Sequence, residues 1–176
     1  MPDQATSSLK PNSAIQDAQT REFIRGLEQG SQTYWDMVQI GDELSRELEI
    51  TPELVILYCD GVEEYNSWYE GWRMNVWRIN GESPFGGAIV PPLMMSHFAL
   101  SVQFDHTRPF AIGSIHTAHD TQLLKPIPVG AKVRITTRAL DKFEKRGRRY
   151  VHHEVLVTNV ADGSTYMRET RDILSL

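Results

Sequence analysis

Two short segments hold the residues best suited to chemistry. The first, residues 64–69, brings Glu64, Asn66 and Tyr69 together among aromatic side chains. The second, residues 85–95, has two glycines and two prolines before an apolar run, which predicts a tight turn leading into a helix. A helix start presents backbone N–H groups that can hold an anion or a carbonyl oxygen. We therefore expect the two segments to meet across a pocket.

The residues around these segments predict an irregular flap followed by a buried helix. Residues 65–84 are rich in aromatic and turn-forming residues and lack a regular period. From Pro92 to Phe104 the chain is apolar nearly all round, as expected for a helix enclosed by other structure. We expect this helix to be the centre of the fold.

Strands are predicted before and after this central part. A strand near residues 44–50 precedes Thr51, which is a suitable N-cap for a helix that reaches about Asp60. The C-terminal half alternates between apolar and polar side chains, and turn signals divide it into four strands. They cover about residues 111–125, 131–143, 148–160 and 164–174. A meander of these strands wrapped around the helix predicts an α+β hotdog fold.

Length and composition favour one folded domain with an N-terminal appendage. The chain has 176 residues, 40% of them hydrophobic, which is enough for a core. Residues 1–12 are polar and contain two prolines, which predicts disorder. We expect a helical extension over residues 13–38 and the hotdog domain over residues 39–176.

Charge and cysteine content narrow the possible partners and location. The net charge of −5 argues against nucleic acid, and the basic run at residues 145–149 fits a hairpin turn. The single cysteine, Cys59, excludes an internal disulfide, and the N-terminus lacks the pattern of a signal peptide. No apolar run approaches the roughly 20 residues that span a bilayer. These features predict a cytoplasmic protein that does not associate with membranes.

Several motifs in a fixed order resemble the MaoC-like hydratase/dehydratase family of hotdog proteins. The resemblance runs from about Ile40 to Leu174. Its pieces are Ile-Gly-Asp-Glu at 40–43, Thr-Pro-Glu at 51–53, the segment 85–94, Leu-Lys-Pro-Ile-Pro-Val-Gly at 124–130, and Asn-Val-Ala-Asp-Gly at 159–163. The resemblance implies addition of water to, or its removal from, a 2-enoyl or 3-hydroxyacyl thioester of coenzyme A or acyl carrier protein.

This sequence departs from the family motif, which has an Asp, then Asn-Pro, and a His five residues after the Asp. By position, Glu64 replaces the Asp and Tyr69 replaces the His, while Asn66 is retained. A branch of the family is similar here, with an aromatic residue for His and a Pro-Pro pair that matches Pro91-Pro92. Because Pro92 has no N–H, Leu93 or Met94 would have to donate to the thioester oxygen.

The resemblance and the chemistry together assign candidate roles. Glu64 is the candidate base and Tyr69 a hydrogen-bond or proton donor, because using an unperturbed phenol as a base at pH 7 costs roughly 4 kcal/mol. Asn66 completes the motif, and His116 is a candidate replacement for the missing imidazole, oriented by Asp120. The candidate substrate-binding residues are Trp68, Trp72, Gly87, Pro92 and Leu93. For the tryptophans and Tyr69, the alternative is a packed aromatic cluster without a catalytic role.

Other histidines are interpreted structurally. His116 and His119 are three residues apart on a strand, so we expect them on opposite faces and without a shared metal. His153 lies in the apolar alternation and is expected to be a core residue. No ligand spacing supports a metal site, and we expect no cofactor.

Three functions remain open at the level of sequence. The first is an acyl-thioester hydratase or dehydratase. The second is a catalytically silent hotdog subunit that binds acyl chains and pairs with an active partner, and the third is a hotdog thioesterase that uses Glu64. We expect a homodimer formed through a sheet edge, with the acyl pocket at the subunit interface, or a hetero-oligomer with another hotdog subunit.

Overall fold

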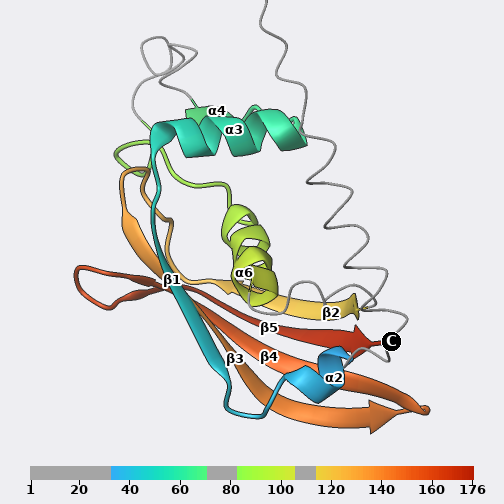
Figure 1. Ribbon diagram of the computed structural model, residues 1–176. Coiled ribbons are helices and arrows are strands. Elements are labelled where there is room, and N and C mark those ends of the chain that lie inside the picture. Colours follow the sequence, from blue (N-terminus) through green and yellow to red (C-terminus); the bar gives the residue numbers. More distant parts are fainter. Residues whose placement is uncertain (1–32, 71–82, 106–113) are drawn as a thin grey trace, which may run out of the picture. The chain divides into compact units, whose positions relative to one another are not determined.

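A five-stranded antiparallel sheet is the frame of the computed structural model (Figure 1). The structure describes residues 33–70, 83–105 and 114–176, and Thr33–Leu176 form one compact unit. The strands are β1 Glu43–Glu49, β2 Ser114–Leu123, β3 Lys132–Lys145, β4 Arg148–Asn159 and β5 Thr165–Ser175. The predictions for residues 1–32 and for most of the aromatic flap, Trp72 included, lie outside the described residues.

The strand order β1-β3-β4-β5-β2 corrects the predicted four-strand meander. Only β3, β4 and β5 form a meander, and the first hairpin turns at Arg146-Gly147, where both residues have positive φ of 55° and 71°. β2 instead pairs with β5 at the far edge, so that β1 lies beside β3. The connection after β2 contains Pro126 and Pro128 and is not a two-residue hairpin turn. It carries the chain across the sheet to β3.

Four helices are described: α2 Tyr34–Met37, α3 Pro52–Val62, α4 Ser67–Glu70 and α6 Met94–Asp105. Helices α3 and α6 lie where the sequence predicts helices, whereas α4 lies in the segment predicted to be an irregular flap. As predicted, Thr51 caps α3, since its hydroxyl accepts a hydrogen bond of 3.3 Å from the Leu54 amide. Within the described residues, no helix is long and apolar enough to cross a membrane.

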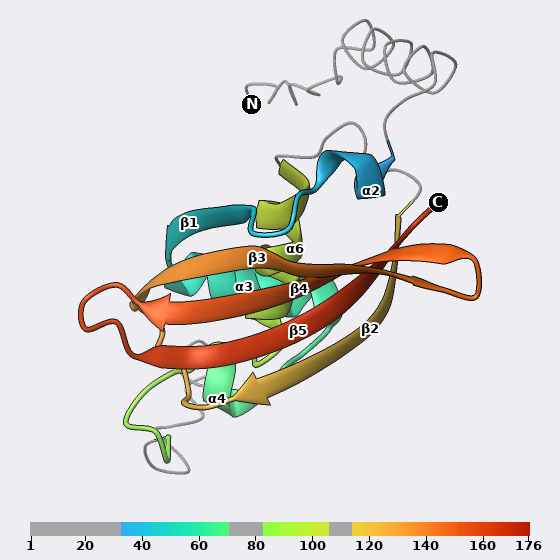
Figure 2. The ribbon, with the colours of Figure 1, turned by 90° about the horizontal axis from the view of Figure 1, so that it is seen from below.

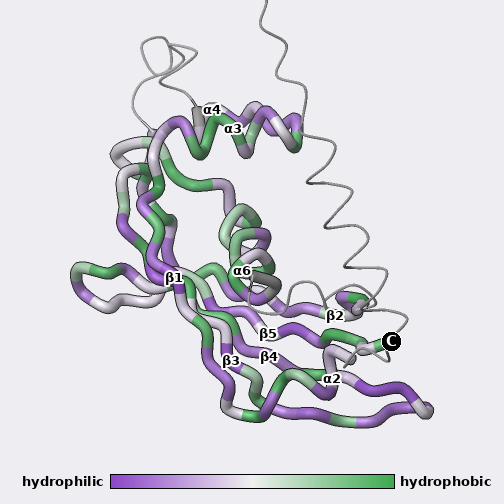
Figure 3. Tube along the Cα trace, viewed as in Figure 1, coloured by the Kyte–Doolittle hydropathy of each residue, from purple (hydrophilic) through white to green (hydrophobic). Residues whose placement is uncertain are grey.

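Helix α6 packs against the inner face of the curved sheet, and the core lies between them (Figure 2). Met94, Met95 and Ala99 of α6 are fully buried. The predicted alternation on β3 and β4 is confirmed, because the residues that point toward α6 are buried and their neighbours are not. Figure 3 shows this mixture of apolar and polar residues along the strands. The burial of α6 therefore sets the inner face of the sheet.

The buried face also contains an ion pair that links α6 to the sheet. Glu169 and Arg171 are two residues apart on β5, so both point inward, and their side chains have no exposed surface. The Arg171 guanidinium donates to Glu169 and, over 3.3 Å, to the Ser96 carbonyl of α6. Thr121 on β2 donates to the second Glu169 oxygen over 3.0 Å. Burial lowers the pKa of Arg171, and the charge of Glu169 opposes this effect.

We predict that Glu169→Gln destabilises the fold by about 3–5 kcal/mol, because it leaves the Arg171 charge buried without a counter-ion. The matched control is Glu154→Gln on β4, whose carboxylate lies 3.8 Å from the half-exposed Arg168. This change should cost less than about 1 kcal/mol. Urea denaturation of both variants measures the difference, and equal losses would contradict the prediction.

Candidate functional site

Residues 64–66 connect α3 to α4, and residues 67–69 are the first three residues of α4. Helix α3 ends at Glu63, which adopts a left-handed conformation with φ of 56°. The Glu64 carboxylate accepts a hydrogen bond of 3.0 Å from the Asn66 amide, and the Asn66 side-chain oxygen accepts one of 2.9 Å from the Trp68 amide. Both side chains are exposed. Glu64 and Asn66 thus build the turn that starts α4 and remain open to solvent.

The Tyr69 side chain, on α4, points into the core. It is 9% exposed and belongs to the same buried cluster as Ile89, Met94 and Met95. Burial raises the pKa of the Tyr69 phenol, and the nearby charge of Glu64 raises it further. The phenol is therefore neutral at pH 7 and acts as a donor. The same electrostatic contact shows that Glu64 and Tyr69 lie close to each other.

The two segments predicted to meet do lie side by side. The Ile89 amide donates a hydrogen bond of 3.0 Å to the Trp68 carbonyl. The Trp68 and Phe85 rings meet edge to face, with 5.4 Å between their centroids. Gly86 has a φ of +75°, which confirms the predicted tight turn, and Gly87 follows it, partly exposed. Residues 64–69 are therefore held against the chain that leads into α6.

The two candidate amide donors at the start of α6, those of Leu93 and Met94, differ in whether they already have a backbone partner. The Met94 amide donates to the Pro91 carbonyl over 3.0 Å, so it is already used. Pro92 has no N–H, and the Leu93 amide donates to no backbone carbonyl of the described residues. Leu93 is 52% exposed. Of the two donors that the sequence offered, Leu93 is thus the one that is free of a backbone bond.

The structure corrects the expectation that His116 and His119 lie on opposite faces. The register of β2 shifts between His116 and Ala118, which marks a β-bulge, and the extra residue turns both rings to the same side. Their centroids are 5.2 Å apart. Within the parts of the chain that are described, no three His, Cys, Asp or Glu side chains are grouped so that they could hold a metal ion.

His116 lies apart from the segment at residues 64–69. Burial and the positive charge of Arg171 lower the pKa of its imidazole. The connection that follows the other end of β2 contacts the candidate site, because Pro128 forms an isolated antiparallel β-bridge with Ile89. Seven residues separate His116 from Leu123 at the end of β2, a distance of about 23 Å along a strand. Within one subunit, His116 therefore does not join Glu64 and Tyr69.

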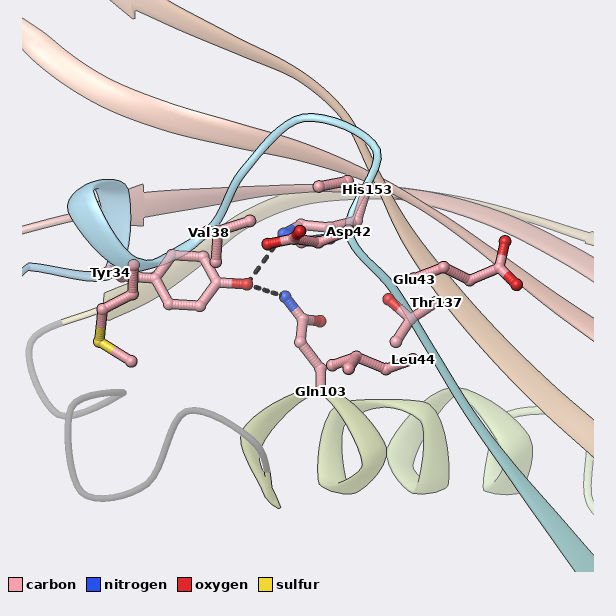
Figure 4. A pocket seen from close by; sticks show the side chains of 10 residues that line it. Tyr34, Val38, Asp42, Glu43, Leu44, Gln103, Thr137 and His153 are labelled. Atoms are coloured by element: carbon pink, nitrogen blue, oxygen red, sulfur yellow. Dashed lines mark hydrogen bonds between the residues drawn. The ribbon is translucent and has the colours of Figure 1, made fainter.

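A second polar cluster was missed by sequence reasoning and lies at the other end of α6 (Figure 4). The Tyr34 hydroxyl forms a hydrogen bond of 2.8 Å with His153 Nε2 and accepts another from the Gln103 amide. His153 is buried, as the alternation on β4 predicted. That buried histidine was the available signal, but its partner Tyr34 is 119 positions away in the sequence. No local pattern links the two residues.

Comparisons with protein-family models and with curated proteins found no match to this sequence. The solved structures that are similar in fold include the following three. R-hydratase PhaJ1 from Pseudomonas aeruginosa has a TM-score of 0.63 and 14% identity, over 80% of this chain and 84% of that one. A 3R-hydroxyacyl-ACP dehydratase complex, HadBC, from Mycobacterium tuberculosis has a TM-score of 0.60 and 18% identity, over 78% of this chain and 96% of that one. A MaoC-like dehydratase from Rhodospirillum rubrum has a TM-score of 0.60 and 16% identity, over 78% of this chain and 92% of that one. These likenesses confirm the predicted hotdog fold.

We predict that His153 makes stability depend on pH. Burial lowers the pKa of its imidazole to about 4, and the charge of Arg171 lowers it further. The unfolded imidazole binds a proton below about pH 6.5, so stability is full above that pH and is lost as the pH falls toward 4. The loss should reach about 3 kcal/mol.

His153→Gln keeps a hydrogen-bonding group near Tyr34 but does not titrate, so this part of the pH dependence should disappear. The control is His119→Gln, on the exposed face of β2; this variant should retain the pH dependence of the wild type. Urea denaturation between pH 7 and pH 4 measures both. Parallel curves for wild type and His153→Gln would refute the assignment.

Proposed function

We propose that this protein is an acyl-thioester hydratase or dehydratase of the MaoC-like type. It would add water to a 2-enoyl thioester of coenzyme A or acyl carrier protein, or remove water from the 3-hydroxyacyl form. The observation that carries the proposal is the Trp68–Ile89 hydrogen bond, because it holds Glu64 and Tyr69 beside the start of α6. Hydratases and dehydratases among proteins of the same fold support this choice.

Each residue of the candidate site has a distinct role in this proposal. The Glu64 carboxylate is exposed and takes a proton from the attacking water, whose oxygen bonds to the β-carbon. The Leu93 amide, at the positive end of the α6 dipole, holds the enolate oxygen that forms. The neutral Tyr69 phenol gives its proton to the α-carbon and recovers one from Glu64 through solvent. Asn66 positions the turn that carries both groups.

The surface beside these groups suits an acyl chain. Trp68, Phe85 and Leu93 are 43%, 44% and 52% exposed, which is high for large apolar side chains, and the Trp68 and Phe85 rings are in contact. Together with Gly87 and Pro92, they would form the wall against which the acyl group packs. An acyl chain would gain roughly 25 cal/mol for each Å² of apolar surface that it covers.

We further propose a homodimer that forms through the β2 edge of the sheet. β2 is an edge strand, and its Ile115 and Leu123 side chains are 47% and 53% exposed. Pairing with another strand would satisfy its free backbone groups and cover these side chains. His116 lies on this strand, so its proposed catalytic role requires that it come from a second subunit.

We predict that Tyr69→Phe and Glu64→Gln each lower kcat for hydration by about 10²- to 10⁴-fold, because each removes one proton-transfer group. The matched control is Tyr65→Phe, since Tyr65 is 57% exposed and lies in the same turn. It should retain activity within about twofold. Loss of the enoyl absorbance of crotonyl, longer and aromatic enoyl thioesters measures the rate. Full turnover by the Glu64→Gln, Tyr69→Phe double variant would refute these roles.

The Leu93 amide can be tested by a backbone substitution. Leu93→Pro removes the N–H, and the loss of one oxyanion donor should lower kcat by about 10²- to 10³-fold. Leu93→Ala removes the side chain but keeps the amide, so it should affect KM more than kcat. Circular dichroism checks that both variants fold. Equal kcat for the two variants would show that this amide does not hold the thioester oxygen.

The second candidate is a silent subunit that binds acyl chains beside an active hotdog partner. The use of Glu64 and Asn66 in the turn, and the proline at position 92, favour it. HadBC is an example of a complex on the same fold. A purified homodimer that hydrates enoyl thioesters would exclude this candidate, and release of free thiol in the same assay would instead identify a thioesterase.

A further inference from the structure

A separate pocket of about 210 Å³ lies at the far end of α6 from the candidate site (Figure 4). Ten residues separate Leu93 from Gln103, which lines it, and this is about 15 Å along a helix. The pocket lies between α2, β1, β3 and β4, under the loop that joins α2 to β1. It is lined by Tyr34, Met37, Val38, Asp42, Glu43, Leu44, Gln103, Thr137, Ala139 and His153.

The floor of the pocket offers a hydrogen bond that the described residues do not use. The Thr137 residue is 2% exposed, and its hydroxyl has no hydrogen-bond partner among them. Figure 4 shows this hydroxyl on the side that faces Tyr34 and Gln103. An unsatisfied buried hydroxyl costs about 1–3 kcal/mol. A ligand that bonds to Thr137 would recover this energy.

The walls of the pocket are apolar and set the size of its occupant. Val38, Leu44 and Ala139, with the ring of Tyr34, give the pocket its apolar surface. A cavity of about 150 Å³ holds a benzene molecule in a protein core. The larger volume here therefore fits a six-membered ring with one substituent, or an aliphatic group of similar size.

The groups that line the pocket select against an anionic ligand. Its floor consists of neutral groups: a hydroxyl, an amide, a phenol and an imidazole. Burial raises the pKa of Tyr34 to about 12 and lowers that of His153 to about 4, so both are neutral near pH 7. An anion bound beside Thr137 would lose its hydration, and the described residues that line the pocket include no lysine or arginine to pair with it. The exposed carboxylates of Asp42 and Glu43 line the pocket and also disfavour an anion.

We propose that this pocket binds a small uncharged molecule with an apolar ring or chain and one hydroxyl or carbonyl group, which bonds to Thr137. The proposal does not depend on the thioester chemistry proposed at the other end of α6, because the two sites share no residue. The ligand class follows from the volume, the apolar walls and the neutral floor.

Phenol, toluene and benzoate are suitable probes, because they share a ring and differ in one group. Isothermal titration of the full-length protein should show one saturable phenol site and weaker or no binding of benzoate. Thr137→Val, which has nearly the same shape, should weaken phenol binding by about tenfold and leave toluene binding unchanged, while Thr137→Ser should retain phenol binding. Ala139→Leu should fill the pocket and block both phenol and toluene.

The proposal would be overturned by an absence of saturable phenol binding to the wild type. Tighter binding of benzoate than of phenol would also overturn it, as would equal phenol affinity of wild type and Thr137→Val. If Ala139→Leu does not fold, the Val and Ser variants of Thr137 decide the question, since both are close in size to threonine. Hydratase activity is measured separately, so failure of one proposal does not affect the other.

Discussion

The burial of α6 against the inner face of the sheet is the constraint on which the rest of the structure depends. A helix that is apolar nearly all round must be covered on most sides, and the curved sheet provides this cover. The polar groups of the helix must then find partners inside the protein. Ser96 does so through Arg171, and Gln103 does so through Tyr34. Both contacts fix the helix at a defined position on the sheet.

The two ends of this helix have different chemical properties. Its N-terminal end has the Leu93 amide, which donates to no backbone carbonyl of the described residues, and lies beside residues 64–69, where a carbonyl oxygen can be held. Its C-terminal end lies over neutral buried groups and an unused hydroxyl, where an uncharged molecule fits. One buried helix thus borders both proposed sites, and the separation between them follows from its length of twelve residues.

Local patterns in the sequence predicted the elements well, but not how the strands pair. The alternation of apolar and polar residues predicted which faces of β3 and β4 are buried, and Thr51-Pro52 predicted the start of α3. The predicted position of β2, next to β3 in a four-strand meander, is wrong. Strand order depends on contacts between residues far apart in the sequence, which local patterns do not show. The bulge near His116 was also missed, since one extra residue leaves no signal in composition. The contact between Tyr34 and His153 has no local signal in the sequence either, because the two residues are 119 positions apart.

The candidate site shows why its residue types and its geometry must be considered together. Glu64 has the only carboxylate among residues 64–69, which makes it the candidate base of this segment. Burial keeps the Tyr69 phenol protonated, which restricts it to donation. A proline at position 92 moves the candidate donor amide one residue along, to Leu93. In the proposed hydration, Glu64 would therefore be the base, Tyr69 the acid and the Leu93 amide the oxyanion donor, so that each residue supplies one of the three groups.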